Sequence, residues 1–105
     1  MDRLKVSSGS DPASTAGAIA NGIREHGAAQ IQVIGPRAVN QAIKAIAIAR
    51  SYLAASAVDL YCVPSFHSIS VEGEEEERTA IHLDVRSRHP LNGVGGSPGG
   101  HASQI

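Results

Sequence analysis

The sequence predicts a two-layer α/β domain in which two helices cover one face of a mixed four-stranded sheet, in the order β-α-β-α-β-β. Two segments with helical apolar spacing each begin at a proline, and they alternate with short segments in which apolar and polar residues alternate. Two successive strand–helix–strand steps favour parallel pairing through right-handed crossovers. The last two strands follow each other across a turn, so they must form an antiparallel hairpin.

The first expected strand covers residues 3–6, where alternation gives one buried face. The turn that follows ends at Asp11, an N-cap candidate, and Pro12 suits the first position of a helix. Gly27 is expected to end this helix as a left-handed cap. Its apolar residues recur at helical spacing: Ala16, Ile19, Ala20 and Ile23.

Two glycines lie inside the first expected helix, at positions 17 and 22. Each costs about 1 kcal/mol relative to alanine in a helix interior. We therefore expect Gly17 and Gly22 to permit a close approach of the backbone to a neighbouring element.

The second expected helix is the most informative segment of the chain. It begins at Pro36, after a strand over residues 30–34 and a glycine that leaves the strand. Its predicted apolar face consists of Ala38, Val39, Ala42, Ile43, Ile46, Ala49 and Leu53. Ile48 projects instead from the polar side, where Ala45 and Tyr52 flank it. We expect this apolar strip to be an oligomer interface, because it otherwise exposes apolar area without a partner.

The polar side of the same helix carries Arg37, Asn40, Gln41 and Lys44. Cations and amide donors beside a helix N-terminus can contact a phosphate backbone, which requires no base-specific geometry. The same pattern also fits an ordinary solvated helix face, and the residues alone leave both interpretations open. Arg50 falls on the apolar side, so either its stem packs there and its head reaches the helix C-terminus, or it pairs with a carboxylate across an interface.

The remaining strands form the expected hairpin. A third strand begins at residue 58, and Pro64 within it cannot donate to a ladder, so the strand is interrupted, bulged or at an edge there. The alternation resumes at residues 69–71, and the fourth strand covers residues 81–85 around a hairpin tip at residues 73–78. We expect residues 1–87 to form the domain and the Gly-, Pro- and Ser-rich residues 88–105 to form a flexible tail.

Charge is segregated along the 105-residue chain. The net charge is −1, but five glutamates lie between residues 72 and 77, and the chain without them carries +4. Aromatic residues make up only 3%, so the core must consist of alanine and branched aliphatics, and a second chain would bury more surface. The single cysteine fits a reducing compartment, and no apolar run approaches the roughly 18 residues of a membrane span. We expect a cytoplasmic protein without a membrane partner.

Several residue types that often carry chemistry lack the pattern that chemistry requires. The five histidines show no metal-ligand spacing, and the glutamate run lacks the fixed ligand spacing of a cation site. Cys62 lies in a strand interior, where a small buried apolar residue is the favoured interpretation over a nucleophile. Serines before the first helix either form a capped turn or bind an anion through backbone amides. Because no acid, base and nucleophile come together, we expect no enzyme activity, no cofactor and no small-molecule substrate.

Three segments together resemble one protein family: Ala16-Gly-Ala-Ile-Ala20, the Ile34 to Arg50 segment, and Glu77-Arg-Thr-Ala-Ile81. Over residues 2–86 the chain resembles the stage V sporulation protein S family of small bacterial proteins. The resemblance implies an Alba-like fold and a role in sporulation, development or septation rather than in catalysis.

The more distant similarity to Alba proteins, which are archaeal chromatin- and RNA-binding dimers, is most visible at residues 37–39 and at Arg50. This chain has Ser10 and Asp11 where Alba proteins carry lysines, and its hairpin tip is acidic where theirs is basic. Both differences weigh against binding to duplex DNA.

The expected function is phosphate-backbone binding to RNA or DNA by a dimer or higher oligomer of developmental regulation. The alternative is an oligomeric protein-interaction scaffold that has lost nucleic-acid binding.

Overall fold

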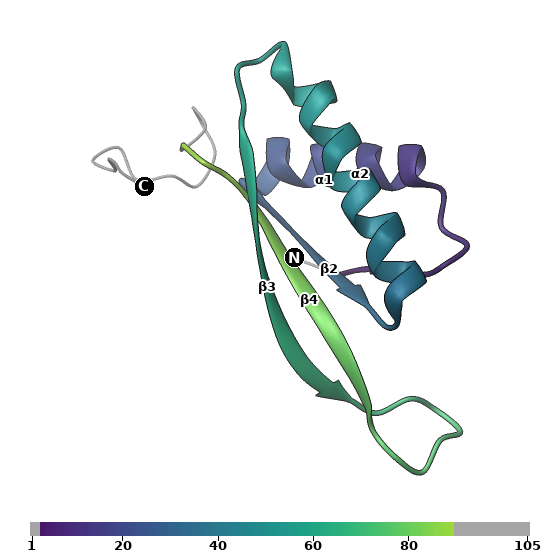
Figure 1. Cartoon of the computed structure of the whole chain (residues 1–105). Coiled ribbons are helices and arrows are strands. Elements are labelled where there is room, and N and C mark those ends of the chain that lie inside the picture. Colours follow the sequence, from purple (N-terminus) through teal and green to yellow (C-terminus); the bar gives the residue numbers. More distant parts are fainter. Residues whose placement is uncertain (1–2, 90–105) are drawn as a thin grey trace.

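The computed structural model describes residues 3–89 and confirms the predicted order of elements (Figure 1). The elements are β1 (Leu4–Val6), α1 (Pro12–His26), β2 (Ala28–Val33), α2 (Pro36–Ala54), β3 (Leu60–Ile69) and β4 (Arg78–Ser87). The tail expected over residues 88–105 lies, from residue 90 onward, outside the described residues. Within the described part, neither helix combines the length and apolar character that crossing a membrane requires.

The sheet is mixed, with the strand order β1-β2-β4-β3. β1 runs parallel to β2, and β4 lies antiparallel to both β2 and β3. The β2-α2-β3 crossover therefore joins two strands of the same direction with β4 inserted between them. β3 is an edge strand, which is why it continues through Pro64 to Ile69 without interruption.

Local sequence signals set the bounds of α1, as predicted. The Asp11 carboxylate accepts hydrogen bonds from the Ser14 backbone N–H at 3.0 Å and from the Ser14 hydroxyl at 2.8 Å. These hydrogen bonds hold the pKa of Asp11 below its ordinary value. At the other end, Gly27 adopts a φ of 77° and donates its N–H to the Ile23 carbonyl at 2.8 Å.

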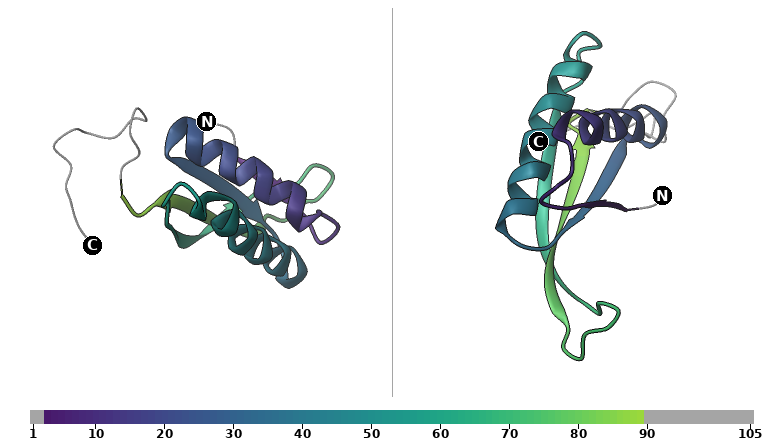
Figure 2. Two further views of the ribbon diagram at one scale, coloured as in Figure 1. Left: turned by 90° about the horizontal axis from the view of Figure 1, so that it is seen from above. Right: turned by 90° about the vertical axis from the view of Figure 1, so that its right-hand side faces the viewer.

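The core lies between the sheet and the two helices, which pack next to each other on the same side of the sheet (Figures 1 and 2). The register aligns Ile31 with Leu4 on one side and with Leu83 on the other, so the apolar residues of neighbouring strands share one face. The largest fully buried side chains are Ile19, Ile23, Ile31, Val33, Leu53 and Val85. Alanines fill much of the remaining contact, as the low aromatic content predicts.

The two glycines of α1 differ. A Cβ at Gly22 would lie 3.2 Å from the Ala28 carbonyl oxygen and 3.3 Å from the Ala29 Cβ, so the predicted close approach is confirmed there. A Cβ at Gly17 would meet nothing within 4 Å, so the same prediction is wrong for Gly17.

The buried face of α2 is rotated from the predicted one. Ala45 is fully buried, whereas Ile43 is 49% exposed. The reason is that α1 packs along α2, so α2 is covered on two sides and its buried arc turns toward Ala45. Spacing within one helix locates an apolar face, but the position of a second helix decides where that face is centred.

The β3–β4 hairpin extends beyond the helices, as Figure 1 and the right view of Figure 2 show. Phe66 in this outer part is 79% exposed, and its neighbour in the register is the half-buried Ile81. Ile81 packs against the core, so the outer part of the hairpin presents the Phe66 side chain to solvent.

Candidate nucleic-acid interface

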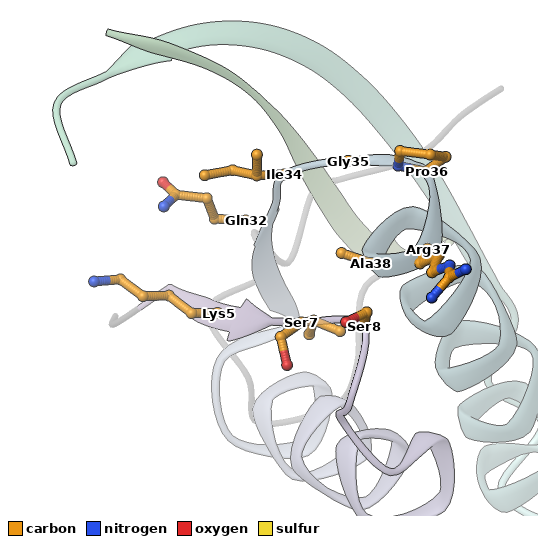
Figure 3. A pocket seen from close by; sticks show the side chains of 10 residues that line it. Lys5, Ser7, Ser8, Gln32, Ile34, Gly35, Pro36, Arg37 and Ala38 are labelled. Atoms are coloured by element: carbon orange, nitrogen blue, oxygen red, sulfur yellow. The ribbon is translucent and has the colours of Figure 1, made fainter. Parts of the chain in front are cut away.

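A pocket of about 560 Å³ lies where β1 and β2 end and α2 begins (Figure 3). We call it the strand-end pocket; it is lined by Lys5, Val6, Ser7, Ser8, Gln32, Ile34, Gly35, Pro36, Arg37 and Ala38. Because β1 and β2 are parallel, both carboxyl ends meet at this edge, which is where open α/β sheets bind ligands. Its walls are mainly apolar, and Lys5 and Arg37 extend on opposite sides of it (Figure 3).

Gly35 makes the sharp turn from β2 into α2. Its φ of 89° lies in the region that glycine adopts at little cost, and no side chain caps the helix N-terminus there. The open first turn of α2 therefore carries N–H groups with no side-chain partner in the described chain. Together with the helix dipole, such a turn favours negative charge nearby.

The exposed side of α2 carries Arg37, Asn40 and Lys44, which we call the α2 stripe. These residues are spaced i, i+3 and i+7, so they follow one another along one face. No aspartate or glutamate occurs anywhere in α2. The local charge of this surface is therefore positive although the chain as a whole is slightly negative.

Gln41, which the sequence predicts to contact phosphate together with the α2 stripe, has a structural role. It is half-buried, and its side-chain amide donates a hydrogen bond to the Ser10 carbonyl at 2.9 Å. The bond joins α2 to the loop between β1 and α1 across 31 positions of sequence. Helical spacing places Gln41 beside Arg37 but contains no signal for a partner so distant in the chain.

The serine-rich loop before α1 is a closed turn. The Ser7 N–H donates to the Ser10 hydroxyl at 2.9 Å, and the Ser10 N–H donates to the Ser7 carbonyl at 3.1 Å. Gly9 also donates its N–H to the Ser7 hydroxyl, at 3.3 Å. Three amides of the loop thus have internal partners, which supports the capped turn over the anion cradle.

The expected oligomer strip is not an exposed surface. Ala45 is completely buried, and the half-buried Ile48 packs against the core. Only Tyr52, at 44% exposure, presents a substantial surface. Arg50 is exposed and pairs with Asp59 of its own chain at 2.9 Å, so the carboxylate partner that the sequence suggested across an interface is found within the chain.

Cys62 is half-buried on β3. Burial, and secondarily the charge of Asp84, raises the pKa of the thiol above its ordinary value. A raised pKa leaves little thiolate at neutral pH, in agreement with the small apolar role that its place in a strand predicts.

The acidic residues and the histidines form no metal centre within residues 3–89, where no group of three or more potential ligands comes together. The glutamates of the hairpin tip are exposed, and Glu74 forms an ion pair of 3.8 Å with Arg78. Two histidines that are 15 positions apart in sequence, His67 and His82, do meet: their rings stack across β3 and β4. The strand register brings them together, and sequence spacing alone contains no sign of it.

Comparison with known families agrees with the fold and with the three segments that carried the resemblance. The model of the family described as stage V sporulation protein S (SpoVS) matches residues 2–88, which includes both helices and all four strands. A match over this much of the chain shows membership. The chain belongs to the stage V sporulation protein S family, and that membership makes it a sporulation-related protein.

Proposed function

We propose that this protein is a non-enzymatic regulator of sporulation that binds nucleic acid through phosphate contacts, without strong sequence specificity. The observation that carries the proposal is the α2 stripe: Arg37, Asn40 and Lys44 are exposed along a helix that contains no acidic residue. Such a surface attracts a polyanion, and its neighbours add to the attraction.

The strand-end pocket supplies the shape that accompanies this charge. It opens beside the first turn of α2, and Lys5 lies on its far side (Figure 3). A sugar–phosphate chain running over α2 would place phosphates near Arg37 and Lys44 and have an apolar hollow beside it. Phosphate contacts of this kind fix position and carry no sequence information.

The number of cations limits the affinity. Each neutralised phosphate contributes a log–log salt slope of about −0.9 on duplex DNA and about −0.7 on single strands. With two cations in the α2 stripe and Lys5 nearby, we expect a shallow slope and weak binding by one chain. An oligomer would strengthen binding by presenting several stripes to one strand.

Fluorescence anisotropy with labelled RNA and DNA at low and physiological salt tests this proposal on the full chain. The proposal expects binding at low salt that weakens steadily as salt rises. The absence of binding to any of these probes at low salt would contradict it.

A second candidate function, an oligomeric protein-interaction scaffold, is favoured by the edge strand β3. Val63 and Phe66 on this strand are 52% and 79% exposed. Exposed apolar residues on an unpaired strand edge can pair with another chain, and Pro64 between them limits such pairing by removing one N–H. In sedimentation velocity, the scaffold function expects Phe66→Ser to dissociate the oligomer and Tyr52→Ser to leave it intact. A wild-type monomer at tens of micromolar would exclude this candidate.

A further inference from the structure

The side of the sheet that faces away from the helices, which we call the open sheet face, is lined by polar side chains from all four strands. In the register, Lys5 aligns with Gln32, and Gln32 aligns with His82, which itself aligns with Ser65. The next row aligns Gln30 with Asp84, and Asp84 with Val63. Apart from two alanines, none of the side chains that alternation places on this face is buried.

A hollow of about 230 Å³ lies on this face, lined by Arg3, Gln30, Ser65, His67, His82, Leu83 and Asp84. Within it, the rings of His67 and His82 stack with centroids 3.8 Å apart and an interplanar angle of 21°. The register places the small Ala80 opposite His67, which leaves room for the His67 ring to lie against His82.

Hydrogen bonds hold both rings in place. His82 donates its Nε2–H to the Gln32 side-chain oxygen at 2.9 Å, and the His67 Nε2 and the Ser65 hydroxyl are 3.1 Å apart. His82 is half-buried, whereas His67 is exposed, so a flat ring surface faces solvent. Partial burial, and then the neighbouring His67 and Arg3, lower the pKa of His82, which favours the neutral form of the ring.

The charges of the open sheet face are positive on balance. Arg3 and Lys5 take part in no ion pair among the described residues, whereas Asp84 is compensated by Arg86 at 3.0 Å. The face thus combines uncompensated cations, side-chain amides and an exposed aromatic ring. An apolar partner would find little to contact here, because Tyr61 and Val63 are its only large exposed apolar residues in the described chain.

These are the groups that bind unpaired nucleotides. Bases that are not paired can be splayed out and stacked on aromatic side chains while the backbone follows a cationic surface, and four-stranded sheets are used in this way. A duplex cannot do the same, because its bases are stacked internally and its flat faces are not accessible. Arg88 already lies over the Tyr61 ring at 5.7 Å, so the histidine pair is the more open stacking surface.

We propose that the open sheet face binds single-stranded RNA, with one base stacked on His67 in the hollow and the adjoining phosphates on Arg3 and Lys5. The inference rests on the proposed nucleic-acid function and adds to it a second surface and a preference for unpaired strands. We propose single-stranded RNA rather than single-stranded DNA because RNA supplies most of the unpaired strands in a cell.

The test measures binding of the full chain to a fluorescein-labelled 12-nucleotide polyuridine, to the same length of polythymidine DNA, and to a labelled RNA duplex. We expect the polyuridine to bind most tightly. His67→Ala should weaken binding to polyuridine at least about fivefold, the lower end of what a base–aromatic stack contributes, and leave binding to the duplex unchanged. His26→Ala, which removes an exposed histidine of α1, is the matched control and should change neither.

An NMR measurement on the wild type keeps the proposal testable if a variant misfolds. Adding polyuridine should shift the ring protons of His67 upfield through the ring current of the stacked base and leave those of His26 in place. Unchanged His67 protons at saturating polyuridine would overturn the proposal, as would an equal effect of His67→Ala on duplex binding. If polythymidine bound as tightly as polyuridine, the preference for RNA would be overturned. If a polyglutamate peptide bound as tightly as polyuridine, the surface would attract negative charge alone and the proposed base stacking would be overturned.

The two proposals fail differently. One outcome is that the variant with both Arg37→Ala and Lys44→Ala keeps its affinity for polyuridine, whereas His67→Ala loses it. In that case the proposal that the α2 stripe binds nucleic acid is wrong, and the proposal for the open sheet face is supported. If only the double variant loses affinity for polyuridine, the proposal for the open sheet face is wrong and the proposal for the α2 stripe is supported.

Discussion

The Arg50 guanidinium donates a hydrogen bond to the Asp59 carboxylate, with 2.9 Å between Nη2 and Oδ1. Arg88 donates to the other oxygen of the same carboxylate, also at 2.9 Å. Asp59 therefore joins the end of α2 to the segment that follows β4. All three side chains are substantially exposed, so this link orients the elements more than it stabilises the fold.

The pKa of Asp59 tests this arrangement. The hydrogen bonds from Arg88, and then from Arg50, lower it from the ordinary 3.8. A depressed carboxyl pKa contributes stability that is present above about pH 3.8 and is lost as the pH falls through the lower folded-state pKa. In carbon-detected NMR titration, Arg88→Ala should raise the pKa of Asp59 more than Arg50→Ala does. The pKa of Asp11 serves as the control, and an unmoved Asp59 pKa in both variants would refute the arrangement.

The buried face of α2 can be tested with one substitution at two positions. Ile46 belongs to the core, whereas Ile43 is half exposed. Ile46→Ala should lower the free energy of unfolding by about 2–5 kcal/mol, because it leaves a cavity. Ile43→Ala should change it by no more than about 0.5 kcal/mol. Urea denaturation measures both, and equal losses would show that α2 is rotated from the position described.

The two glycines of α1 should respond differently to alanine. Gly17→Ala gains helix propensity in open space, so it should raise the free energy of unfolding by about 0.5–1 kcal/mol. Gly22→Ala has the same gain, but its Cβ must push against the Ala28 carbonyl at 3.2 Å. Thermal denaturation should therefore give Gly17→Ala the higher Tm. If Gly22→Ala had the same Tm as Gly17→Ala, the start of β2 would be able to move away from the new Cβ without loss of stability, which would contradict this prediction.

The acidic hairpin tip should oppose nucleic-acid binding. Changing Glu74, Glu75, Glu76 and Glu77 to serine removes four negative charges from exposed positions. Binding to labelled RNA should tighten, most strongly at low salt, where the Debye length is about 30 Å at 0.01 M. Glu25→Ser, which removes an exposed charge from α1, is the control and should have a smaller effect. Weaker binding by the serine variant would indicate that the tip contacts the ligand favourably.

The elements that the sequence predicts well are those fixed by local chemistry. The start of α1 is set by Asp11 and Pro12, and its end is set by Gly27. The start of α2 is set by Gly35 and Pro36. These signals are local because helix caps and proline act within one turn of the chain. Pro64 left an interruption, a bulge or a sheet edge as alternatives for β3, and the structure shows the edge. The insertion of β4 between β2 and β3 depends on pairing across the whole domain.

The parts of the site that the sequence did not predict depend on distant neighbours. Ala45 and Ile43 exchange roles because α1 covers α2 from the side. Gln41 donates a hydrogen bond to the carbonyl of Ser10, which is 31 positions away in the sequence. His67 stacks on His82 only because of the β3–β4 register. Arg37, Asn40 and Lys44 lie on the exposed face as predicted, since exposure of a polar helix face follows from periodicity.

The most direct test of the central claim measures the salt dependence of nucleic-acid binding with the α2 stripe removed. The variant with both Arg37→Ala and Lys44→Ala should bind RNA and DNA more weakly than the wild type for every sequence. Its log–log salt slope should be shallower by about 0.9 per lost phosphate contact on duplex and about 0.7 on single strands. Arg24→Ala, which removes an exposed cation from α1, should leave affinity and slope unchanged. A double variant that binds with the wild-type affinity and slope would contradict the account.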